Sequence, residues 1–370
     1  MVFENIQKCG NHEQVIFCHD ADTGLKGIIA IHNTTLGPAL GGTRMWNYAN
    51  EEDALVDVLR LSEGMTYKAA AAGLNLGGGK AVIIGDPKKD KSEGLFRAFG
   101  MYINALNGRY ITAEDVGTTV WDMENVYMET PWVTGIPKGL GGSGDPSPYT
   151  AHGVLMAIKA SCKEKLGSDN LKDVRVAVQG LGSVGSNLVK YLSEEGAVIT
   201  IADIDQEAVS RLADQYGCTP VTPDEIHKTE CDVFAPCALG AIINDQTIPE
   251  LQCKIVAGGA NNMLAETRHG DALREVGILY APDFVANAGG LMNVFAELEG
   301  YSVERALERT TSVYDNMMNV FDVAKKENCS TYDAAFKLAS KRLETLGRLK
   351  RKHQGQVSRP FTTLKEVYNR

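Results

Sequence analysis

The 370-residue sequence lacks the patterns that mark several classes of protein. Its eight cysteines form no CxxC pair and its seven histidines are scattered, so we expect reduced thiols and no bound metal. No stretch approaches the ~18 consecutive apolar residues of a membrane span. The segment from Met1 to Gly10 includes Glu4 and holds no long apolar run, which is unlike a signal peptide. These absences predict a cytoplasmic protein with no membrane segment.

An excess of basic charge is also missing. The chain holds 37 Lys and Arg against 47 Asp and Glu, for a formal net charge of −10. A mildly acidic chain does not in general attract nucleic acid or an anionic membrane, so we expect neither partner. The basic stretch from Arg348 to His353 is expected to be a solvated helix end, with a phosphate-binding patch as the alternative.

The sequence does contain enough apolar residues, 44%, and enough length for two domains. A Gly-, Pro- and Ser-rich linker spans 135–148, and strand and helix patterns then alternate to about residue 280. This alternation predicts a parallel, doubly wound sheet, so the expected fold class is α/β. We expect an N-terminal α/β domain at 1–135, joined by a C-terminal helix within 331–370, and a Rossmann domain at 136–330. The main elements are expected as strands at 13–18, 25–32, 80–84, 174–179, 197–202, 233–235, 254–258 and 278–280, and as helices at 51–65, 92–106, 150–165, 183–193, 206–216, 303–327 and 331–346.

One glycine-rich turn fits a dinucleotide site. The strand at 174–179 runs into Gly180-Leu181-Gly182-Ser183-Val184-Gly185, a GxGxxG, and a helix pattern follows. In such a turn Gly180 allows the tight bend, Gly182 lets the backbone approach the pyrophosphate, and Gly185 lets the helix pack on the strand. The pyrophosphate would lie at the helix N-terminus, where free N–H groups favour anions. The alternative is a glycine-rich turn in an α/β protein that binds no nucleotide.

A carboxylate at the end of the next strand predicts which dinucleotide binds. Asp203 follows Gly180 by 23 residues (203 − 180). A carboxylate there accepts hydrogen bonds from the ribose hydroxyls and repels a 2′-phosphate, so NAD is expected rather than NADP. Asp205 could share this role or could be a turn residue.

A second glycine cluster precedes a lysine. Gly77, Gly78 and Gly79 come directly before Lys80, and glycines there would let a ligand approach the backbone. The segment is not a phosphate loop, because the spacing GxxxxGK[ST] is not met. Lys68 lies 12 residues earlier (80 − 68). One lysine of such a pair can bind a substrate carboxylate, while the other, desolvated near a like charge, could act as a base. Alternatively, both are surface lysines with buried stems.

Asp115 is a third candidate. It follows an apolar strand pattern at 110–112, within Thr112-Ala113-Glu114-Asp115. A carboxylate at a strand end can relay protons or bind an ammonium group, and it can equally cap a helix. The residues alone leave both roles open.

Taken together, these motifs resemble the glutamate/leucine/phenylalanine/valine dehydrogenases over nearly the whole chain, and the leucine dehydrogenases are the most similar members. The resemblance is carried by LNLGGGKAVIIGDP (74–87) and GLGSVG (180–185), and by TLGPALGGTRMW (35–46), GMTYKAA (64–70), NGRYITAEDVGT (107–118), GDPSP (144–148), CDVFAPCALG (231–240), AGGANN (257–262) and APDFVANAGG (281–290).

The resemblance implies an NAD-dependent oxidative deamination and a role for each candidate. Lys68 would bind the substrate carboxylate, helped by Gly41 and Gly42. Lys80 would be the base that activates water for attack on an iminium carbon, and Asp115 would relay protons. The residues implied to hold the nicotinamide end are Thr150 and one of Asn261 and Asn262. The first domain would bind substrate and form oligomers.

The side chain of the substrate is implied by four apolar positions: Leu40, Ala113, Leu291 and Val294. Glutamate enzymes have a lysine where Leu40 stands, so glutamate would leave an unpaired, desolvated charge. Ala113 resembles the leucine enzymes, whereas Leu291 and the sequence Gly-Lys-Ala at 79–81 resemble the phenylalanine enzymes. We predict a branched-chain substrate, with L-leucine foremost and phenylalanine as the alternative.

Two hypotheses from other classes are also open. A protein that binds or senses NAD without catalysis would lack Lys68, Lys80 or Asp115, and all three are present. A hydroxy-acid dehydrogenase would need a histidine base; His152 is the nearest candidate, and we interpret it as structural or solvent-facing. Finally, the resemblance implies a closed homo-oligomer, an octamer for leucine enzymes, whose only other partners are an amino acid, its 2-oxo acid and ammonia.

Overall fold

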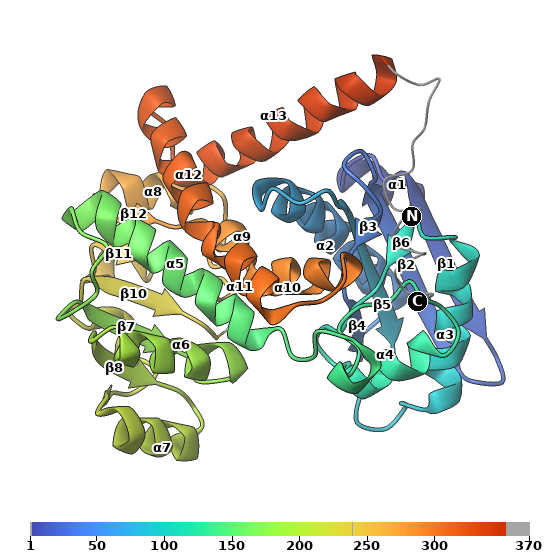
Figure 1. Cartoon of the computed structure of the whole chain (residues 1–370), viewed down its shortest axis with the longest axis horizontal. Helices are drawn as coiled ribbons and strands as arrows, with labels where there is room; N and C mark the ends of the chain where they lie inside the picture. Colours follow the sequence, from blue (N-terminus) through green and yellow to red (C-terminus); the bar gives the residue numbers. More distant parts are fainter. Residues whose placement is uncertain (1, 239, 353–370) are drawn as a thin grey trace. The chain divides into compact units, whose positions relative to one another are not determined.

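The computed structural model describes residues 2–238 and 240–352, the last two as backbone only, and confirms the α/β class (Figure 1). The chain divides into two compact units. Unit 1 holds residues up to Asp145, Val294–Ser302 and those from Ala339 onward, and unit 2 holds Pro146–Asn293 and Val303–Leu338. The domain limits expected from the sequence stay a prediction. No helix in the described part of the chain is long and apolar enough to cross a membrane.

Unit 1 is built on a mixed six-stranded sheet in the order β1-β2-β5-β3-β6, with β4 also paired to β5. The β1, β2 and β5 strands are antiparallel neighbours, and β3, β4 and β6 join in parallel. The strands are β1 (Gln14–Asp20), β2 (Leu25–Asn33), β3 (Ala39–Leu40), β4 (Thr43–Trp46), β5 (Gly77–Ile84) and β6 (Tyr110–Ile111).

Helices cover both faces of this sheet, as the alternation of its side chains requires. One face packs against α2 (Glu51–Ala71) through Ile28, Ala30 and Val82. The other packs against α3 (Glu93–Ala105) and α4 (Val120–Tyr127) through Ile29, Ile31, Ala81 and Ile83. Even-numbered residues of β5 therefore face α2. The helix α2 extends beyond the predicted end at 65, so it carries Lys68.

Unit 2 is the predicted parallel, doubly wound sheet, in the order β12-β11-β10-β7-β8-β9. Strand order reverses between β7 and β10, the point at which such sheets bind ligands beyond the carboxyl ends of their strands. The strands are β7 (Arg175–Gln179), β8 (Val198–Ala202), β9 (Thr219–Pro220), β10 (Val233–Pro236), β11 (Ile255–Val256) and β12 (Leu279–Tyr280), and the first helices are α5 (Ser147–Leu166), α6 (Ser183–Glu194) and α7 (Gln206–Tyr216).

Several elements differ from their predicted limits. The helix expected at 303–327 is broken into α11 (Val303–Thr311) and α12 (Val313–Glu327). Around the break, the hydroxyls of Thr310, Thr311 and Ser312 donate back to main-chain carbonyls and compete with helical hydrogen bonds. The helices that periodicity did not predict are α1 (Val2–Lys8), α4, α8 (His269–Glu275), α9 (Asp283–Ala286) and α10 (Gly289–Leu298).

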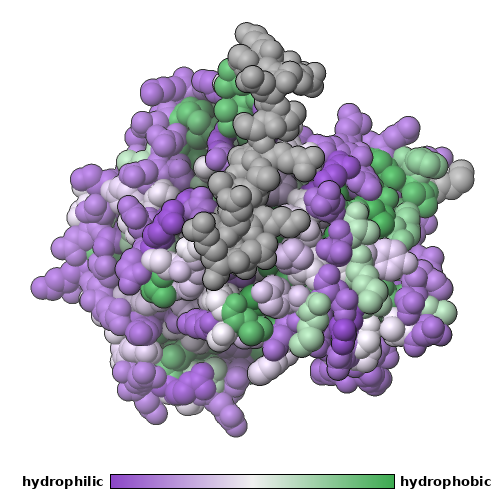
Figure 2. Space-filling model, turned by 45° about the vertical axis from the view of Figure 1, so that its right-hand side comes forward, coloured by the Kyte–Doolittle hydropathy of each residue, from purple (hydrophilic) through white to green (hydrophobic). Residues whose placement is uncertain are grey.

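The last described helix is α13 (Thr331–Lys352). Residues 348–350 are exposed, and Arg348 pairs with Glu344 one turn away. The predicted solvated helix end is therefore confirmed for these residues, while His353 lies outside the described residues. The face seen in Figure 2 is mostly hydrophilic with separate hydrophobic areas, as is usual for a folded surface.

Candidate active site

Lys80 lies inside β5 and faces α2. Its side chain is only 8% exposed, and Nζ is 2.7 Å from Oδ2 of Asp115. A lysine this buried needs a partner for its charge, and Asp115 is that partner. The alternative of a surface lysine is therefore wrong for Lys80.

The three glycines before Lys80 are part of the strand, and the space beside them is filled by the protein itself. A Cβ at Gly77 would lie 2.0 Å from the Asn33 carbonyl oxygen, and one at Gly78 would lie 2.0 Å from Thr66 Oγ1. A Cβ at Gly79 would meet the Tyr110 ring at 2.8 Å. The expectation that these glycines leave room for a ligand is wrong, because they let α2 and β6 pack closely around the strand that carries Lys80.

Asp115 is held by two cations and does not cap a helix. The N-cap of α4 is Thr119, whereas Asp115 accepts hydrogen bonds from Lys80 and, at 3.3 Å, from Arg44 Nε. Burial works to raise the pKa of Asp115, but the charges of Lys80 and Arg44 outweigh it and hold that pKa below its ordinary value. The carboxylate is thus kept ionised beside the Lys80 ammonium.

Lys68 lies near the C-terminal end of α2 and is partly buried. The helix meets β5 closely near this point, since Thr66 contacts the backbone of Gly78, two residues before Lys80. Gly41 and Gly42 lie between β3 and β4, where a Cβ would meet the carbonyl oxygens of Gly79 at 1.9 Å and Glu114 at 2.3 Å. Packing within unit 1 therefore already requires glycine at both positions.

The four positions implied to contact the substrate side chain are all buried: Leu40 is 1% exposed, Ala113 8%, Leu291 7% and Val294 6%. Leu40 belongs to β3, which pairs with β6 just before Ala113. Further along α10 from Val294, the Glu297 carboxylate accepts hydrogen bonds from the N–H groups of Gly135, at 3.0 Å, and Ser143, at 2.8 Å. These bonds fasten the glycine-rich segment at 135–143 to the part of α10 that belongs to unit 1.

The glycine turn of unit 2 connects β7 to α6 at the point where strand order reverses. Gly180 has φ +93°, and a Cβ there would lie 2.7 Å from the Ala238 backbone. A Cβ at Gly185 would lie 1.9 Å from the Gly180 carbonyl oxygen, so that glycine lets α6 approach the turn. Gly182, in contrast, has nothing within 4 Å of such a Cβ. No side chain caps α6, which begins at Ser183, so its first N–H groups have no side-chain partner from the N-cap residue.

Asp203 lies against this turn. Its carboxylate accepts hydrogen bonds from the Leu181 and Asp205 N–H groups. Asp205 itself is the N-cap of α7 and accepts from Glu207 and Ala208, so it has a structural role. The neighbouring Ile204 is 88% exposed.

The other proposed cofactor residues lie elsewhere in unit 2. Thr150 Oγ1 donates to the Pro146 carbonyl oxygen at 3.1 Å, in the first turn of α5. Asn261 Oδ1 accepts at 2.8 Å from Asn287, which is only 3% exposed. Asn262 has φ +51°, and its carbonyl oxygen accepts from the Ala241 N–H. The side chains of Asn261 and Asn262 are both exposed. The bond from Ala241 holds the backbone of the turn that carries them.

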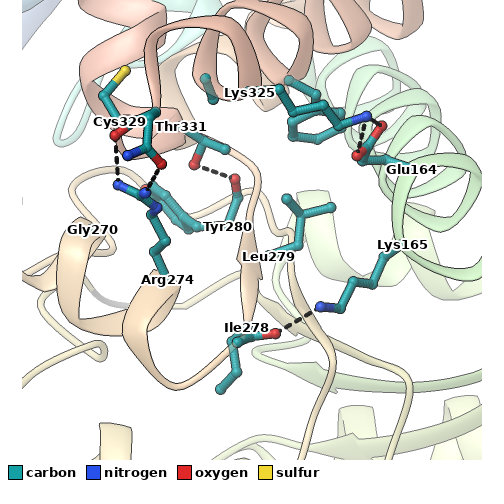
Figure 3. Close-up of a pocket in the computed structure, with 14 residues that line it drawn as sticks. Glu164, Lys165, Gly270, Arg274, Ile278, Leu279, Tyr280, Lys325, Cys329 and Thr331 are labelled. Carbon is teal, nitrogen blue, oxygen red and sulfur yellow. Dashed lines mark hydrogen bonds and ion pairs between the residues drawn. The ribbon is translucent and has the colours of Figure 1, made fainter.

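A hollow of about 350 Å³ in unit 2 is formed by α5, α8, β12 and α12 (Figure 3). Its cationic groups are all paired within the hollow: Arg274 with Asn328, Lys165 with the Gly277 carbonyl oxygen and Lys325 with Glu164. The protein itself therefore already satisfies the charges of these three cations.

Among the described residues, one group combines metal-ligand types within reach of one another: Asp245, Glu266 and His269. His269 Nδ1 accepts from the Glu266 N–H at 3.0 Å, so a neutral ring carries its hydrogen on Nε2, facing Asp245. Arg268 pairs with both carboxylates. This geometry does not suit a metal ion. All eight cysteines are unpaired.

Sequence reasoning missed three residues. Arg44 lies within the quoted segment TLGPALGGTRMW, but only the fold brings it to Asp115. Asn287 orients Asn261 from 26 residues away along the chain. The third is Ile204, and the signal for it in the sequence is an apolar residue directly after Asp203.

His152 is structural, in agreement with its interpretation from the sequence. Its Nδ1 is 2.8 Å from Thr310 Oγ1, and its ring packs edge-on against Tyr191.

Two family models together match most of the chain. Residues 12–132 match the Glu/Leu/Phe/Val dehydrogenase dimerisation domain, and 141–209 and 205–350 match Glutamate/Leucine/Phenylalanine/Valine dehydrogenase. A leucine dehydrogenase of Geobacillus stearothermophilus is 59% identical, over 91% of this chain and 92% of the relative. A phenylalanine dehydrogenase of Lysinibacillus sphaericus is 50% identical, over 91% and 90%.

Among solved structures, the L-tryptophan dehydrogenase from Nostoc punctiforme has a TM-score of 0.82 and 45% identity, covering 94% of this chain and 99% of that chain. The family models, the relatives and this solved structure each match most of the chain. The chain therefore belongs to the glutamate/leucine/phenylalanine/valine dehydrogenase family.

Proposed function

We propose that this chain is an NAD-dependent L-amino-acid dehydrogenase that converts L-leucine, water and NAD⁺ to 4-methyl-2-oxopentanoate, ammonia and NADH. The observation that carries the proposal is the buried ion pair of Lys80 with Asp115, within a chain of this family. The similarity to leucine dehydrogenases, at 59% identity against 50% for a phenylalanine dehydrogenase, supports a branched-chain substrate.

Lys80 is the base in this proposal. Oxidation at the substrate Cα leaves an iminium, whose carbon is attacked by water. Lys80 Nζ, in its neutral form, takes a proton from that water as the new C–O bond forms. At 2.7 Å, Asp115 Oδ2 is within hydrogen-bond reach of Nζ and can receive the proton in turn. Asp115 then returns the proton to the amino nitrogen of the carbinolamine. As the C–N bond breaks and ammonia leaves, the hydroxyl gives its remaining proton to Lys80, which is neutral again, and the C=O bond of the 2-oxo acid forms.

Substrate orientation is the role proposed for Lys68. An ammonium group there would pair with the α-carboxylate, and the glycine pair Gly41 and Gly42 would keep the neighbouring backbone compact. Fixing the carboxylate in this way aligns Cα for reaction, which can account for a large part of the rate enhancement. The buried, apolar Leu40 offers no charge to a second carboxylate, which supports the exclusion of glutamate.

The described residues fit an NAD molecule at the glycine turn of unit 2. Open space beside Gly182 and the uncapped start of α6 suit a pyrophosphate, with Leu181, Ser183 and Val184 completing the turn. NAD⁺ held there would supply the acceptor for the hydride that leaves the substrate Cα. Asp203, already hydrogen-bonded to the turn, would accept from the ribose hydroxyls and repel a 2′-phosphate. Thr150 and one of Asn261 and Asn262 would hold the nicotinamide end.

The test is NADH formation at alkaline pH with leucine, valine, isoleucine, phenylalanine and glutamate as substrates. We expect the highest kcat/KM for leucine and no turnover of glutamate. Faster turnover of phenylalanine, which Leu291 would favour, would overturn the substrate assignment. Turnover with NADP but not NAD would contradict the role of Asp203. NAD binding without turnover of any amino acid would instead indicate a sensing protein.

The proposed assembly and location rest on two further observations. The match of residues 12–132 to a dimerisation domain supports a closed homo-oligomer, for which we propose an octamer. Eight unpaired cysteines support a reducing compartment such as the cytoplasm. Mass measurement of the native protein tests the first proposal.

A further inference from the structure

Arg44 connects the Lys80–Asp115 pair to a second ion pair in unit 1. Its Nε donates to Asp115 Oδ2 at 3.3 Å, and its Nη1 donates to Asp57 Oδ2 at 2.8 Å. Asp115 Oδ2 is the same oxygen that Lys80 Nζ contacts at 2.7 Å. Two cations therefore share one carboxylate oxygen. Of these two cations, Arg44 is also hydrogen-bonded to a second carboxylate, that of Asp57.

The backbone fixes this arrangement. Arg44 lies in β4 opposite Val82 of β5, so its side chain is on the α2 face, as is that of Lys80. The segment that carries Asp115 runs beside β4, where Met45 donates from its N–H to the Val116 carbonyl oxygen at 2.9 Å. Thr118 Oγ1 ties the same segment to the Thr43 carbonyl oxygen. Both ends of the Arg44–Asp115 contact are thus on fixed backbone.

The far end of Arg44 is also held. Asp57, on α2, accepts a hydrogen bond from the Tyr48 hydroxyl at 2.7 Å and pairs with Arg60 at 3.2 Å. Arg60 is 61% exposed, whereas Arg44 is 23% and Asp57 14% exposed. Asp53 lines the same surface hollow as Arg44 and Asp57.

We propose that Arg44 is a positioning residue that holds Asp115 at Lys80 and, by sharing Oδ2, sets the pH at which Lys80 gives up its proton. The inference rests on the proposed function, in which Lys80 is the base. A carboxylate shared with a guanidinium has less charge to offer a second donor, so the Nζ proton is bound less tightly than by an unshared carboxylate.

Other charged groups around Asp115 do not replace Arg44. Glu114 precedes it in the chain, Tyr110 lies on β6, and Lys68 lies further along α2. Neither Glu114 nor Tyr110 can supply a positive charge, and the cations that lower the pKa of Asp115 most are Lys80 and Arg44, not Lys68. Without Arg44, Asp115 and Asp57 both lose the cation that bridges them. The lost positive charge raises the affinity of the Lys80–Asp115 pair for its proton, which acts in the same direction as the loss of sharing.

The experiment compares Arg44→Met, Arg44→Lys and, as a matched control, Arg60→Met, which removes the other arginine of Asp57. The first readout is the pH at which kcat/KM rises to half its limiting value, with the amino acid that the unmodified protein oxidises fastest. The second, independent of turnover, is the pH dependence of Lys80 acetylation by acetic anhydride, measured by peptide mass spectrometry.

For Arg44→Met we expect both midpoints to move to higher pH by about one unit, with kcat recovering at high pH. Arg44→Lys keeps a positive charge, so both midpoints should return most of the way to those of the unmodified protein. Arg60→Met should leave both midpoints unchanged. If Arg44→Met does not fold, Arg44→Gln, which also removes the positive charge, replaces it, with a shift in the same direction expected. Unchanged midpoints, or equal shifts in Arg60→Met, would overturn the inference. Failure of the proposed function is distinguishable, since no amino acid would then be oxidised while the Lys80 acetylation midpoint could still be measured.

Discussion

Two glycine-rich segments carry the proposed chemistry, and glycine has a different physical reason in each. In the segment Gly77–Gly79 of unit 1, a Cβ at any position would collide with other parts of the protein. In the turn Gly180–Gly185 of unit 2, the first and last glycines are equally crowded, but Gly182 faces open space. We call Gly77–Gly79 the packed support, because protein atoms fill the space beside all three glycines. We call the space beside Gly182 the opening, because protein atoms crowd the turn only at Gly180 and Gly185.

The difference follows from what each segment has to hold. The first positions a side chain of the protein, Lys80, whose Nζ must stay 2.7 Å from Asp115. Close packing on both faces of β5 keeps that geometry fixed, because a packed interior resists small displacements. In the proposed function the second admits the pyrophosphate of NAD, which needs exposed backbone N–H groups and room beside them. The same residue type therefore supports rigidity in unit 1 and access in unit 2.

The largest effect is expected from Lys80→Ala, which removes the side chain but leaves the packed support in place. Loss of the base should lower kcat by about 10³-fold or more, since general base catalysis contributes ~10²–10⁴-fold. NADH binding, which we propose for the glycine turn of unit 2, should not change. Fluorescence titration of NADH and a steady-state assay measure the two quantities. The control is Lys89→Ala, a lysine whose side chain is 80% exposed. Normal turnover of Lys80→Ala would remove the assignment of the base.

The next effect tests the packed support itself. A methyl group at Gly78 would lie 2.0 Å from Thr66 Oγ1 and 2.3 Å from its backbone nitrogen, so Gly78→Ala forces α2 and β5 apart. Overpacking of this kind costs ~1–3 kcal/mol, which lowers Tm by roughly 2–10 °C. The control is Gly64→Ala on α2, where nothing lies within 4 Å. Alanine favours helix there, so Tm should rise slightly. Equal Tm values for both variants would contradict the close contact between α2 and β5.

Gly182→Ala tests the opening. Its φ of −65° is accessible to alanine and the added methyl meets no protein atom, so Tm should stay unchanged. If the space is reserved for a pyrophosphate, NADH affinity should fall by about 10-fold, or ~1.4 kcal/mol. Isothermal titration with NADH measures this. The control is Gly139→Ala, a glycine of unit 1 with nothing within 4 Å. Unchanged affinity in Gly182→Ala would show that the ligand lies elsewhere.

The two segments also differ in how far the sequence predicts them. Spacing alone predicts the strand, turn and helix at 174–193, because each glycine of a GxGxxG meets a local requirement. The contacts of Gly77–Gly79 are with Asn33, Thr66 and Tyr110, which are distant in the chain, so no local pattern reveals them. For the same reason Lys80 and Asp115 are recognisable as candidates, whereas Arg44 is not: its role depends on the pairing of β4 with β5.

The smallest effect concerns Glu114, a carboxyl group beside the packed support. Burial, and then the charges of Asp145, Asp115 and Asp122 in that order, raise the pKa of Glu114 to about 7. Since its ordinary pKa is near 4.5, the neutral form is favoured by folding. The stability it contributes is complete below about pH 4.5 and is lost as pH rises through 7.

Glu114→Gln keeps the neutral form at every pH. The variant should therefore match the unmodified protein in Tm near pH 4.5 and exceed it by a few degrees at pH 8, where the unmodified carboxyl is ionised. Differential scanning calorimetry across this range measures the difference, with Glu51→Gln at an exposed position as the control. A Tm gain that does not grow between pH 4.5 and 8 would mean that Glu114 is solvated, and that the close packing around Lys80 ends before it reaches Glu114.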